Sequence, residues 1–299
     1  MSADGRFAPS PSGPLHLGNL RTALLAWCFA RSAGARFVLR IEDLDPQRSR
    51  REHEAGILSD LDRIGIEWDG EPARQSDRAP SHRAAFEALR AAGLLYRCWC
   101  TRAEVREAAS APHGQPGGAY PGTCRRLDAA QIAQRERDGR PPAWRVDAGA
   151  RRVSFNDELH GEVEAAVDDF VVWRELDALA AYNLAVVVDD AADGVREVVR
   201  GDDLLETTPR QILVAELLGL AVPAYAHVPL VLGGDGARLA KRHGAVTLAE
   251  RLARGESVEE VVGRLATSAG LAESGARLTA AGVLASFDRR SLSREPAVF

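Results

Sequence analysis

Short apolar runs alternate along this sequence with longer segments of helical periodicity. Four runs rich in β-branched residues end in charged residues or glycines, as buried strands of a parallel sheet do. These predicted strands are Phe37–Ile41, Leu184–Val188, Val195–Arg200 and Val228–Leu232. The predicted helices are Leu20–Ala33, His53–Ile64, Ser81–Ala92, Pro209–Leu218, Leu248–Arg254, Val258–Ala266 and Leu278–Ser286. This alternation predicts an α/β fold with a doubly wound parallel sheet.

Polar residues follow directly after these predicted strands. Glu42 and Asp43 come after the first strand, and Asp202 and Asp203 come after the third. In open parallel sheets, ligands bind outside the carboxyl ends of the strands. We therefore expect the functional site at this edge of the sheet.

The middle of the chain has a different pattern, with clustered cysteines, Pro/Gly punctuation and many arginines between about Tyr96 and Ala166. We interpret it as an insertion between two halves of a nucleotide-binding domain. The expected division is 1–95 for the first half, 96–168 for the insertion, 169–232 for the second half, and 233–299 for a lysine-bearing loop with a small helical region. We expect Arg289–Phe299 to be a surface tail.

The bulk composition predicts a globular protein with a substantial core. Of 299 residues, 45% are hydrophobic and 27% charged, which is ordinary for such proteins. No apolar run reaches the roughly 18 residues of a membrane span, and no secretory signal is visible. We therefore expect a soluble, cytoplasmic protein. We also expect it to be a monomer. Four cysteines, three of them clustered, favour a metal site over a disulfide framework.

The net charge of −5 argues mildly against nucleic-acid binding, because phosphate contacts need Lys and Arg. A basic stretch in the middle of the chain has the opposite character. It contains Arg125, Arg126, Arg135, Arg137, Arg140, Arg145, Arg151 and Arg152. From the residues alone, this stretch suits either a solvated face or a contact with RNA.

Two motifs near the ends of the predicted sheet domain indicate nucleotide chemistry. Arg6–Asn19 predicts a strand, a Pro/Gly/Ser loop and a helix start, where unpaired amides and the helix dipole favour anions. His16 and Asn19 are three residues apart and so share one helix face. Arg238–Ala245 is a Gly-bounded loop with two adjacent cations, one of them Lys241. Together they indicate a nucleoside triphosphate held between the helix start and a mobile lysine.

These motifs resemble the two signatures of class I aminoacyl-tRNA synthetases, with His16–Asn19 in place of "HIGH" and Leu239–Arg242 in place of "KMSKS". Other segments look like the glutamyl/glutaminyl branch of that class: Arg6–Gly13, Arg40–Asp45, Tyr182–Asp190 and Arg200–Asp203. The ordered matches run from Arg6 to Ala245, roughly four-fifths of the chain. The resemblance implies a Rossmann-like catalytic domain that uses ATP with Mg²⁺.

The resemblance also implies roles for individual residues in ATP binding. The implied ATP-binding residues are Pro9, His16, Gly18, Asn19 and Lys241, and the implied catalytic residues are His16, Asn19 and Lys241. His16 would donate to the phosphates, and Lys241 would offset the charge that develops on the leaving pyrophosphate. Ala240 replaces a serine that is common in the family's loop.

A glutamate pocket needs cations for the carboxylates and an anion for the ammonium. By resemblance, the pocket residues are Arg6, Phe7, Ala8, Pro9, Ser10, Glu42, Tyr182 and Arg200. Arg6 and Arg200 would approach the carboxylates, Glu42 would take the ammonium, and Tyr182 would lend a hydroxyl. An uncharged glutamine would leave a cation unpaired, which favours glutamate. The alternative is that Arg6, Glu42 and Arg200 form a structural ion-pair network.

Cys98, Cys100 and Cys124 look like zinc ligands, and zinc requires a fourth. The orthodox candidate is His113, whereas the resemblance to short glutamyl synthetase-like proteins points to Tyr120. Closed coordination would make the zinc structural. The alternative is three unligated buried thiols. Cys28 lies in an apolar helical segment and is expected in the core.

The length of the chain after the lysine loop bears on which group would accept the activated glutamate. Only 54 residues follow Ala245 (299 − 245), whereas a full glutamyl-tRNA synthetase continues into a large anticodon-binding region. The chain therefore resembles the short enzymes that activate L-glutamate with ATP and transfer it to queuosine in the anticodon loop of tRNA(Asp). One alternative is a truncated glutamyl-tRNA synthetase that charges the tRNA 3′ end. Another is a catalytically silent RNA-binding paralogue, against which intact His16, Lys241, Glu42 and Arg200 argue.

Overall fold

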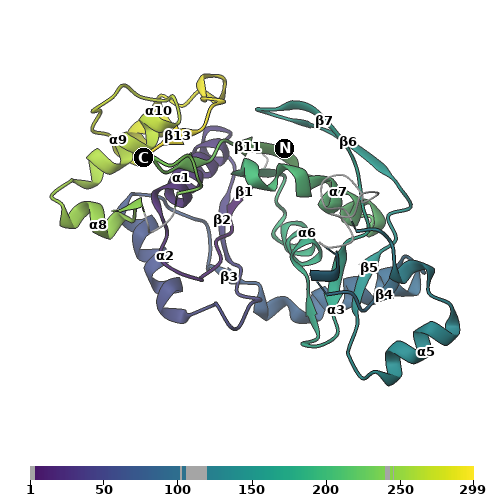
Figure 1. Ribbon diagram of the computed structural model, residues 1–299. Coiled ribbons are helices and arrows are strands. Elements are labelled where there is room, and N and C mark those ends of the chain that lie inside the picture. The colour runs from purple at the N-terminus through teal and green to yellow at the C-terminus, as the bar shows by residue number, and fades with distance from the viewer. Residues whose placement is uncertain (1–3, 102, 106–119, 240–242, 245) are drawn as a thin grey trace.

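Parallel strands form the centre of the molecule, and helix α1 (Leu17–Ser32) packs against them (Figure 1). The computed structural model describes residues 4–101, 103–105, 120–239, 243–244 and 246–299. The first sheet has the order β1-β2-β3, all parallel, with Arg6 beside Val38. Its strands are β1 Gly5–Phe7, β2 Phe37–Ile41 and β3 Ala73–Arg74. This arrangement confirms the predicted α/β class with parallel strands.

A second sheet continues beside β1 in the order β10-β11-β6-β7. Strand β10 is parallel to β11, and β11 meets β6 where Tyr225 lies beside Asp157. Strands β6 and β7 form an antiparallel hairpin. The bounds are β6 Arg152–Asp157, β7 Gly161–Ala166, β10 Glu197–Gly201 and β11 Ala224–Val228. The hairpin therefore connects the middle of the chain to the strands that bear Arg200 and His227.

A third, antiparallel sheet with the order β4-β5-β8-β9 lies at the opposite end of the molecule from the C-terminal helices (Figure 1). Its strands are β4 Leu95–Cys98, β5 Ala143–Val146, β8 Val171–Arg174 and β9 Leu179–Ala180. The helices of the first three-quarters of the chain are α2 Arg51–Arg63, α3 Ala79–Ala91, α5 Ala129–Arg137, α6 Tyr182–Asp193 and α7 Thr208–Leu217. The expected division into four segments stays a prediction.

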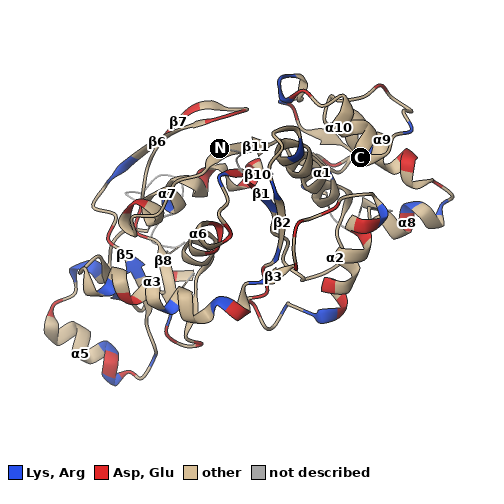
Figure 2. Ribbon diagram, turned by 180° about the vertical axis from the view of Figure 1, so that it is seen from behind, with Lys and Arg blue, Asp and Glu red and all other residues tan. Residues whose placement is uncertain are grey.

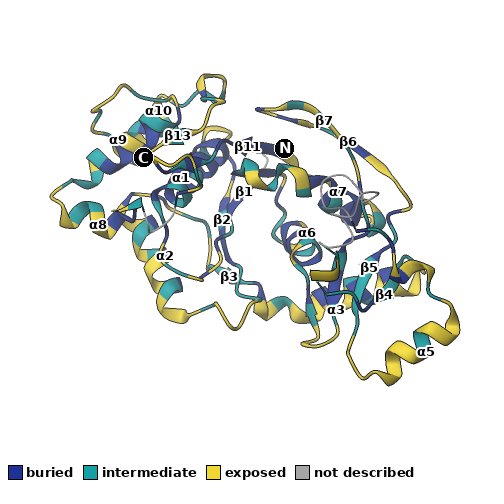
Figure 3. Ribbon diagram, viewed as in Figure 1, coloured by how far each residue is buried: buried dark blue, intermediate teal, exposed yellow. Residues whose placement is uncertain are grey.

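Helix α1 is buried along most of its length, and dark blue predominates on it in Figure 3. Leu20, Leu24 and Phe29 are fully buried, and Cys28 lies among them in the core as predicted. The helix contacts β1 and β10 on one side and the C-terminal helices on the other. A helix held this firmly gives the residues at its N-terminus a fixed position.

The C-terminal region consists of α8 (Leu248–Ala253), α9 (Val258–Ser268) and α10 (Ala280–Ala285). The predicted surface tail is wrong in part, because β13 (Ala297–Val298) pairs in parallel with β12 (Val231–Leu232). Leu292 is also buried. No helix in the described ranges is long and apolar enough to cross a bilayer.

The predicted strand at Leu184–Val188 is wrong, because these residues lie in helix α6. A short apolar run rich in valine suits a buried helix as well as a buried strand, and periodicity alone does not separate the two. The helix ends at Gly194, whose φ of 74° is the left-handed conformation typical of a helix end. The other three predicted strands overlap strands of the structure.

Candidate active site

A cleft of about 560 Å³ opens beside the N-terminus of α1 and the carboxyl ends of β1 and β10. It lies at the sheet edge where the sequence predicts a ligand site. All predicted ATP and glutamate residues in the described part of the chain line it: Arg6, Phe7, Ala8, Pro9, Ser10, His16, Gly18, Asn19, Glu42, Tyr182 and Arg200. Lys241 lies outside the described residues. The structure thus brings together residues almost 200 positions apart.

His16 is the N-cap of α1 and forms a reciprocal pair with Asn19. The Nδ1 atom of His16 accepts the amide hydrogen of Asn19 at 3.2 Å, and Oδ1 of Asn19 accepts the amide hydrogen of His16 at 3.2 Å. This arrangement is a capping box. Because Nδ1 accepts, the proton of a neutral imidazole is on Nε2. The helix cap therefore fixes His16 as a donor through Nε2.

Burial, together with the charge of Arg238 and against the opposing effect of Asp203, lowers the pKa of His16 to about 4. Arg238 also lines the cleft and donates to Asp203 at 2.5 Å. At neutral pH the imidazole is therefore uncharged, because its pKa lies well below 7. His16 is thus a neutral hydrogen-bond donor in the cleft, and the positive charge of Arg238 nearby is offset in part by Asp203.

Gly18 makes room for the His16 ring. A Cβ atom on Gly18 would lie 3.0 Å from Nδ1 and from Cε1 of His16, closer than such atoms normally approach.

The backbone amide of Leu17, the first residue of α1, already has a hydrogen-bond partner. It donates to the carbonyl of Val246 at 2.7 Å. Fewer amides are therefore left for an anion than a bare helix start offers. The same bond ties the segment after the lysine loop to the His16 helix.

One side of the cleft is a buried network of opposite charges. Arg6 donates to Asp190 at 3.3 Å, and Arg40 donates to Asp190 at 2.7 Å and to Glu42 at 3.4 Å. Burial would raise the pKa of Asp190, but the charges of Arg40 and Arg6 hold it below its usual range. Burial raises the pKa of Glu42, and the same two arginines only partly oppose this. The buried Glu42 carboxylate is therefore only partly compensated by the protein, and a cationic ligand in the cleft would stabilise its charged form.

On the other side of the cleft, Arg200 is held by hydrogen bonds to neutral side chains. Its Nε donates to Nε2 of His227 at 3.0 Å, Nη1 to Oε1 of Gln211 at 2.8 Å, and Nη2 to the hydroxyl of Thr208 at 2.7 Å. Arg200 is only 5% exposed, and among the described residues no carboxylate lies within ion-pair distance of it. A buried cation of this kind favours an anionic ligand.

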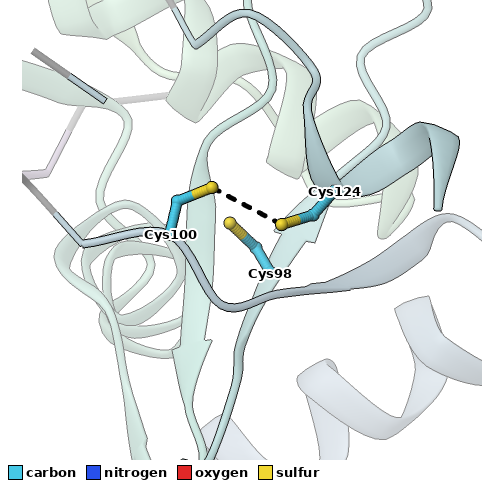
Figure 4. Close-up of side chains that lie close together, drawn as sticks. All are labelled: Cys98, Cys100 and Cys124. Carbon is cyan, nitrogen blue, oxygen red and sulfur yellow. Dashed lines mark hydrogen bonds between the residues drawn. The ribbon is translucent and has the colours of Figure 1, made fainter. Parts of the chain in front are cut away.

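Three cysteines converge in the middle part of the chain (Figure 4). The sulfurs of Cys98, Cys100 and Cys124 lie within 4.8 Å of one another. The hydroxyl oxygen of Tyr120 is 3.4 Å from the sulfur of Cys98 and 3.5 Å from that of Cys100. His113, the other candidate for a fourth ligand, lies outside the described residues. The predicted four-residue set therefore meets at one point.

A second cavity, of about 1320 Å³, adjoins the cleft and shares Ser10, Ser12, Glu42 and Tyr182 with it. It reaches the cysteine cluster. Its cationic lining residues are Arg48, Arg140, Arg145 and Arg174. Arg145 belongs to β5, and Figure 2 shows blue ribbon at this strand.

The predicted basic stretch does not form one free surface. Arg125 pairs with Asp147 at 2.9 Å and with Asp169 at 3.2 Å, and Arg152 pairs with Glu164 at 2.6 Å. Neutralised arginines of this kind attract phosphate weakly. Arg140 and Arg145 of this stretch line the second cavity, and no carboxylate in the described residues forms an ion pair with either of them.

Comparison with known proteins identifies the family. The sequence pattern of the tRNA synthetases class I (E and Q), catalytic domain, matches residues 3–298. The chain belongs to this family. It is a class I synthetase-type ligase with the class I fold.

Two curated class I relatives and one solved structure place the chain more closely. A Glutamyl-Q tRNA(Asp) synthetase of Nocardia farcinica is 58% identical over 98% of this chain and 91% of the relative. Glutamate–tRNA ligase 1 of Halorhodospira halophila is 41% identical over 100% of this chain and 65% of the relative. A glutamate tRNA ligase from Elizabethkingia meningosepticum, crystallised with its amino acid, matches with a TM-score of 0.85 at 26% identity. That match covers 100% of this chain and 67% of the ligase.

Sequence reasoning from the class I motifs missed several residues of the site. Arg238 and Asp203 stand inside quoted motifs, so their proximity to the cleft could have been anticipated. Arg40 and Asp190 also stand in such motifs, but only the fold shows that they share an ion pair across 150 positions. His227 carries no motif, and its contact with Arg200 is visible only in the structure.

Proposed function

We propose that this chain activates L-glutamate with ATP and transfers it to queuosine in the anticodon loop of tRNA(Asp). The observation that carries the proposal is the 58% identity to a Glutamyl-Q tRNA(Asp) synthetase over nearly the full length of both proteins. The identity to a glutamate–tRNA ligase is 41%, over 65% of that ligase. The composition of the cleft supports the amino-acid part of the proposal independently.

In the activation step, a carboxylate oxygen of glutamate attacks the α-phosphorus of ATP, and the bond to pyrophosphate breaks. Glutamyl adenylate forms. His16 would donate through Nε2 to a phosphate oxygen, and Arg238 and Lys241 would oppose the charge on the departing pyrophosphate. These roles are positioning and charge stabilisation, as expected where the protein forms no bond to the substrate. Mg²⁺ accompanies ATP in enzymes of this class.

Glutamate would lie between the two charged sides of the cleft. Glu42 would take the ammonium, and Tyr182 would contribute its hydroxyl. Arg6 and Arg200 would take the two carboxylates. Arg200 is the better candidate for the side-chain carboxylate, because its charge has no counter-ion among the described residues. A neutral glutamine amide would leave that buried charge uncompensated, so the pocket favours glutamate.

The acceptor would enter through the second cavity. A hydroxyl of queuosine would attack the acyl carbon of the adenylate, an ester would form, and AMP would leave. Arg140 and Arg145 at this cavity suit the phosphates of an RNA loop. Arg125 and Arg152 are held in ion pairs with carboxylates, so Arg140 and Arg145 are stronger candidates for RNA contact than those two predicted residues.

The cysteine cluster fits a structural zinc. Cys98, Cys100 and Cys124 would supply three thiolates, and Tyr120 would supply the fourth ligand atom. Thiolates and one oxygen in closed coordination suit a tetrahedral Zn²⁺. Hydrogen bonds with the neighbouring thiols lower the pKa of Cys98, but the same contacts raise the pKa of Cys100, and burial raises the pKa of Tyr120, so a bound metal would have to displace the protons of those two groups. The zinc would stabilise this part of the chain without entering the reaction.

The test is glutamate transfer to tRNA(Asp) with and without queuosine. We expect the purified enzyme, ATP and glutamate to glutamylate only the queuosine-containing tRNA, as seen by mass spectrometry of its nucleosides. Removal of the 3′-terminal adenosine should leave transfer intact, because the terminal ribose is not the acceptor. Unmodified transcript is the control.

The second candidate is charging of the tRNA 3′ end, and the 41% identity to a glutamate–tRNA ligase across the whole of this chain favours it. The same experiment separates the two. Glutamylation of tRNA(Glu) that disappears when the terminal adenosine is removed would overturn the queuosine proposal and establish this candidate.

A further inference from the structure

His227 and Asp157 form a buried pair directly behind Arg200. His227 is in β11 and Asp157 ends β6, and their exposed fractions are 0% and 1%. Nδ1 of His227 lies 2.6 Å from Oδ2 of Asp157, and Nε2 lies 3.0 Å from Nε of Arg200. The three side chains therefore form one continuous array from the β6–β7 hairpin to the cleft.

The array fixes the tautomer of His227. An arginine Nε can only donate, so Nε2 of His227 must accept, and the ring proton is on Nδ1. Nδ1 then donates to Asp157. Burial and the charge of Arg200 lower the pKa of His227 and outweigh the opposing effect of Asp157. The imidazole is thus a neutral acceptor toward Arg200.

Asp157 is itself held in place by backbone amides. It accepts the amide hydrogens of Leu159 at 3.0 Å, His160 at 3.1 Å and His227 at 3.1 Å. These bonds satisfy its charge without bringing it to Arg200. A carboxylate touching Arg200 directly would instead neutralise the guanidinium, as Asp190 does for Arg40.

We infer that His227 and Asp157 are positioning residues that hold Arg200 through a neutral acceptor and so reserve its charge for the side-chain carboxylate of the substrate. The imidazole separates the Asp157 carboxylate from the guanidinium while it fixes the orientation of the guanidinium. Gln211 and Thr208 complete the set of neutral acceptors. This inference rests on the proposed role of Arg200 in glutamate binding.

The test is glutamate-dependent exchange of pyrophosphate into ATP with two variants at one position. His227→Phe removes the acceptor, and we expect the KM for glutamate to rise about 30-fold while the KM for ATP changes less than about twofold. His227→Gln restores an acceptor at the position of Nε2, and it should recover most of the loss. A structural role alone would not produce this split or this rescue.

His82→Phe is the matched control. His82 is also buried, and its Nε2 lies 2.8 Å from Asp189, but His82 does not line the cleft. This variant should leave the KM for glutamate unchanged. An unchanged KM for glutamate in His227→Phe, an equal rise for ATP, or the same rise in His82→Phe would each overturn the inference.

Two further variants keep the inference falsifiable. If His227→Phe does not fold, Asp157→Asn is the variant that tests the inference. We expect it to raise the KM for glutamate about 3- to 10-fold and to leave the KM for ATP unchanged. No rise in the KM for glutamate would overturn the inference. Arg200→Gln tests the proposed function separately. Normal glutamate use by Arg200→Gln would refute the role of Arg200 itself, whereas impaired Arg200→Gln with normal His227→Phe would refute only the positioning role.

Discussion

The two sides of the cleft hold arginines of equal burial in opposite ways. Arg6 is 4% exposed and Arg200 is 5% exposed. Arg6 donates to the carboxylate of Asp190, which also binds Arg40 at 2.7 Å. Arg200 donates only to neutral acceptors, His227 among them. Arg6 thus has a carboxylate in direct contact within the protein, whereas no carboxylate in the described residues contacts Arg200.

This difference separates a structural ion-pair network from a binding site. Both were open interpretations of Arg6, Glu42 and Arg200 in the sequence. Breaking a buried ion pair leaves an uncompensated charge and destabilises the fold. Among the described residues, no carboxylate contacts Arg200 directly, and Asp190 acts on it only at longer range, so removing Arg200 should destabilise the fold less. We therefore expect substitutions at Asp190 to act mainly on stability and substitutions at Arg200 to act mainly on glutamate use.

The largest expected effect is that of Arg200→Gln on glutamate activation. Loss of the guanidinium should raise the KM for glutamate about 100- to 1000-fold, because a buried substrate carboxylate would lose its charged partner. Pyrophosphate exchange at varied glutamate measures this, and urea denaturation should show little change in the unfolding free energy. If Arg200→Gln instead lost stability and kept its KM for glutamate, Arg200 would be a structural residue and not a binding residue.

Asp190→Asn should show the complementary behaviour. We expect the free energy of unfolding to fall by about 2–4 kcal/mol, because Arg40 and Arg6 lose a buried counter-ion. The rise in the KM for glutamate should be smaller than in Arg200→Gln. Glu87→Gln, in an exposed pair with Arg90 at 2.9 Å, is the control and should change stability by less than about 0.5 kcal/mol. If Asp190→Asn and Glu87→Gln lowered the free energy of unfolding equally, burial of the ion pair would not determine its contribution to stability.

The cysteine cluster provides a prediction away from the cleft. One zinc per chain should co-purify, Cys124→Ser should lose it, and His113→Ala should keep it. ATP binding should be nearly unchanged without zinc, because the cluster lies in a different sheet region from His16. Metal analysis and nucleotide titration measure these outcomes. A metal-free His113→Ala variant would show that Tyr120 is not the fourth ligand.

The smallest expected effect is on stability as the pH falls. The pKa of His16 is about 4 in the folded protein against 6.5 as its usual value. Between these values the unfolded chain binds more protons, so stability should fall as the pH drops from about 6.5 toward 4, by on the order of 1 kcal/mol. His16→Asn keeps an N-cap acceptor and removes the titration. Its urea midpoint should depend less on pH in this window; an identical dependence would contradict the assignment.

The sequence predicted the elements better than their contacts. Apolar runs identified β2 and β10, because a buried strand needs such a run. The same signal failed at Leu184–Val188, where a helix buries the valines equally well. The short pairing of β13 with β12 was missed, because two-residue strands leave no pattern.

The motifs predicted which residues line the cleft, and the fold supplied what holds them. His16, Glu42 and Arg200 follow from segments that resemble known signatures. The contact of His227 with Asp157 spans 70 positions, and no periodicity or spacing indicates a contact of that length. The neutral environment of Arg200, which distinguishes it from Arg6, is therefore a property that only the structure reveals.

The most direct test is a crystal structure of the enzyme with bound glutamate. The account predicts that the side-chain carboxylate of glutamate lies within hydrogen-bond distance of the Arg200 guanidinium. Nε of Arg200 should still donate to His227, and Arg6 should still contact Asp190. A side-chain carboxylate bound by Arg6 alone, with Arg200 facing no anion, would contradict the account.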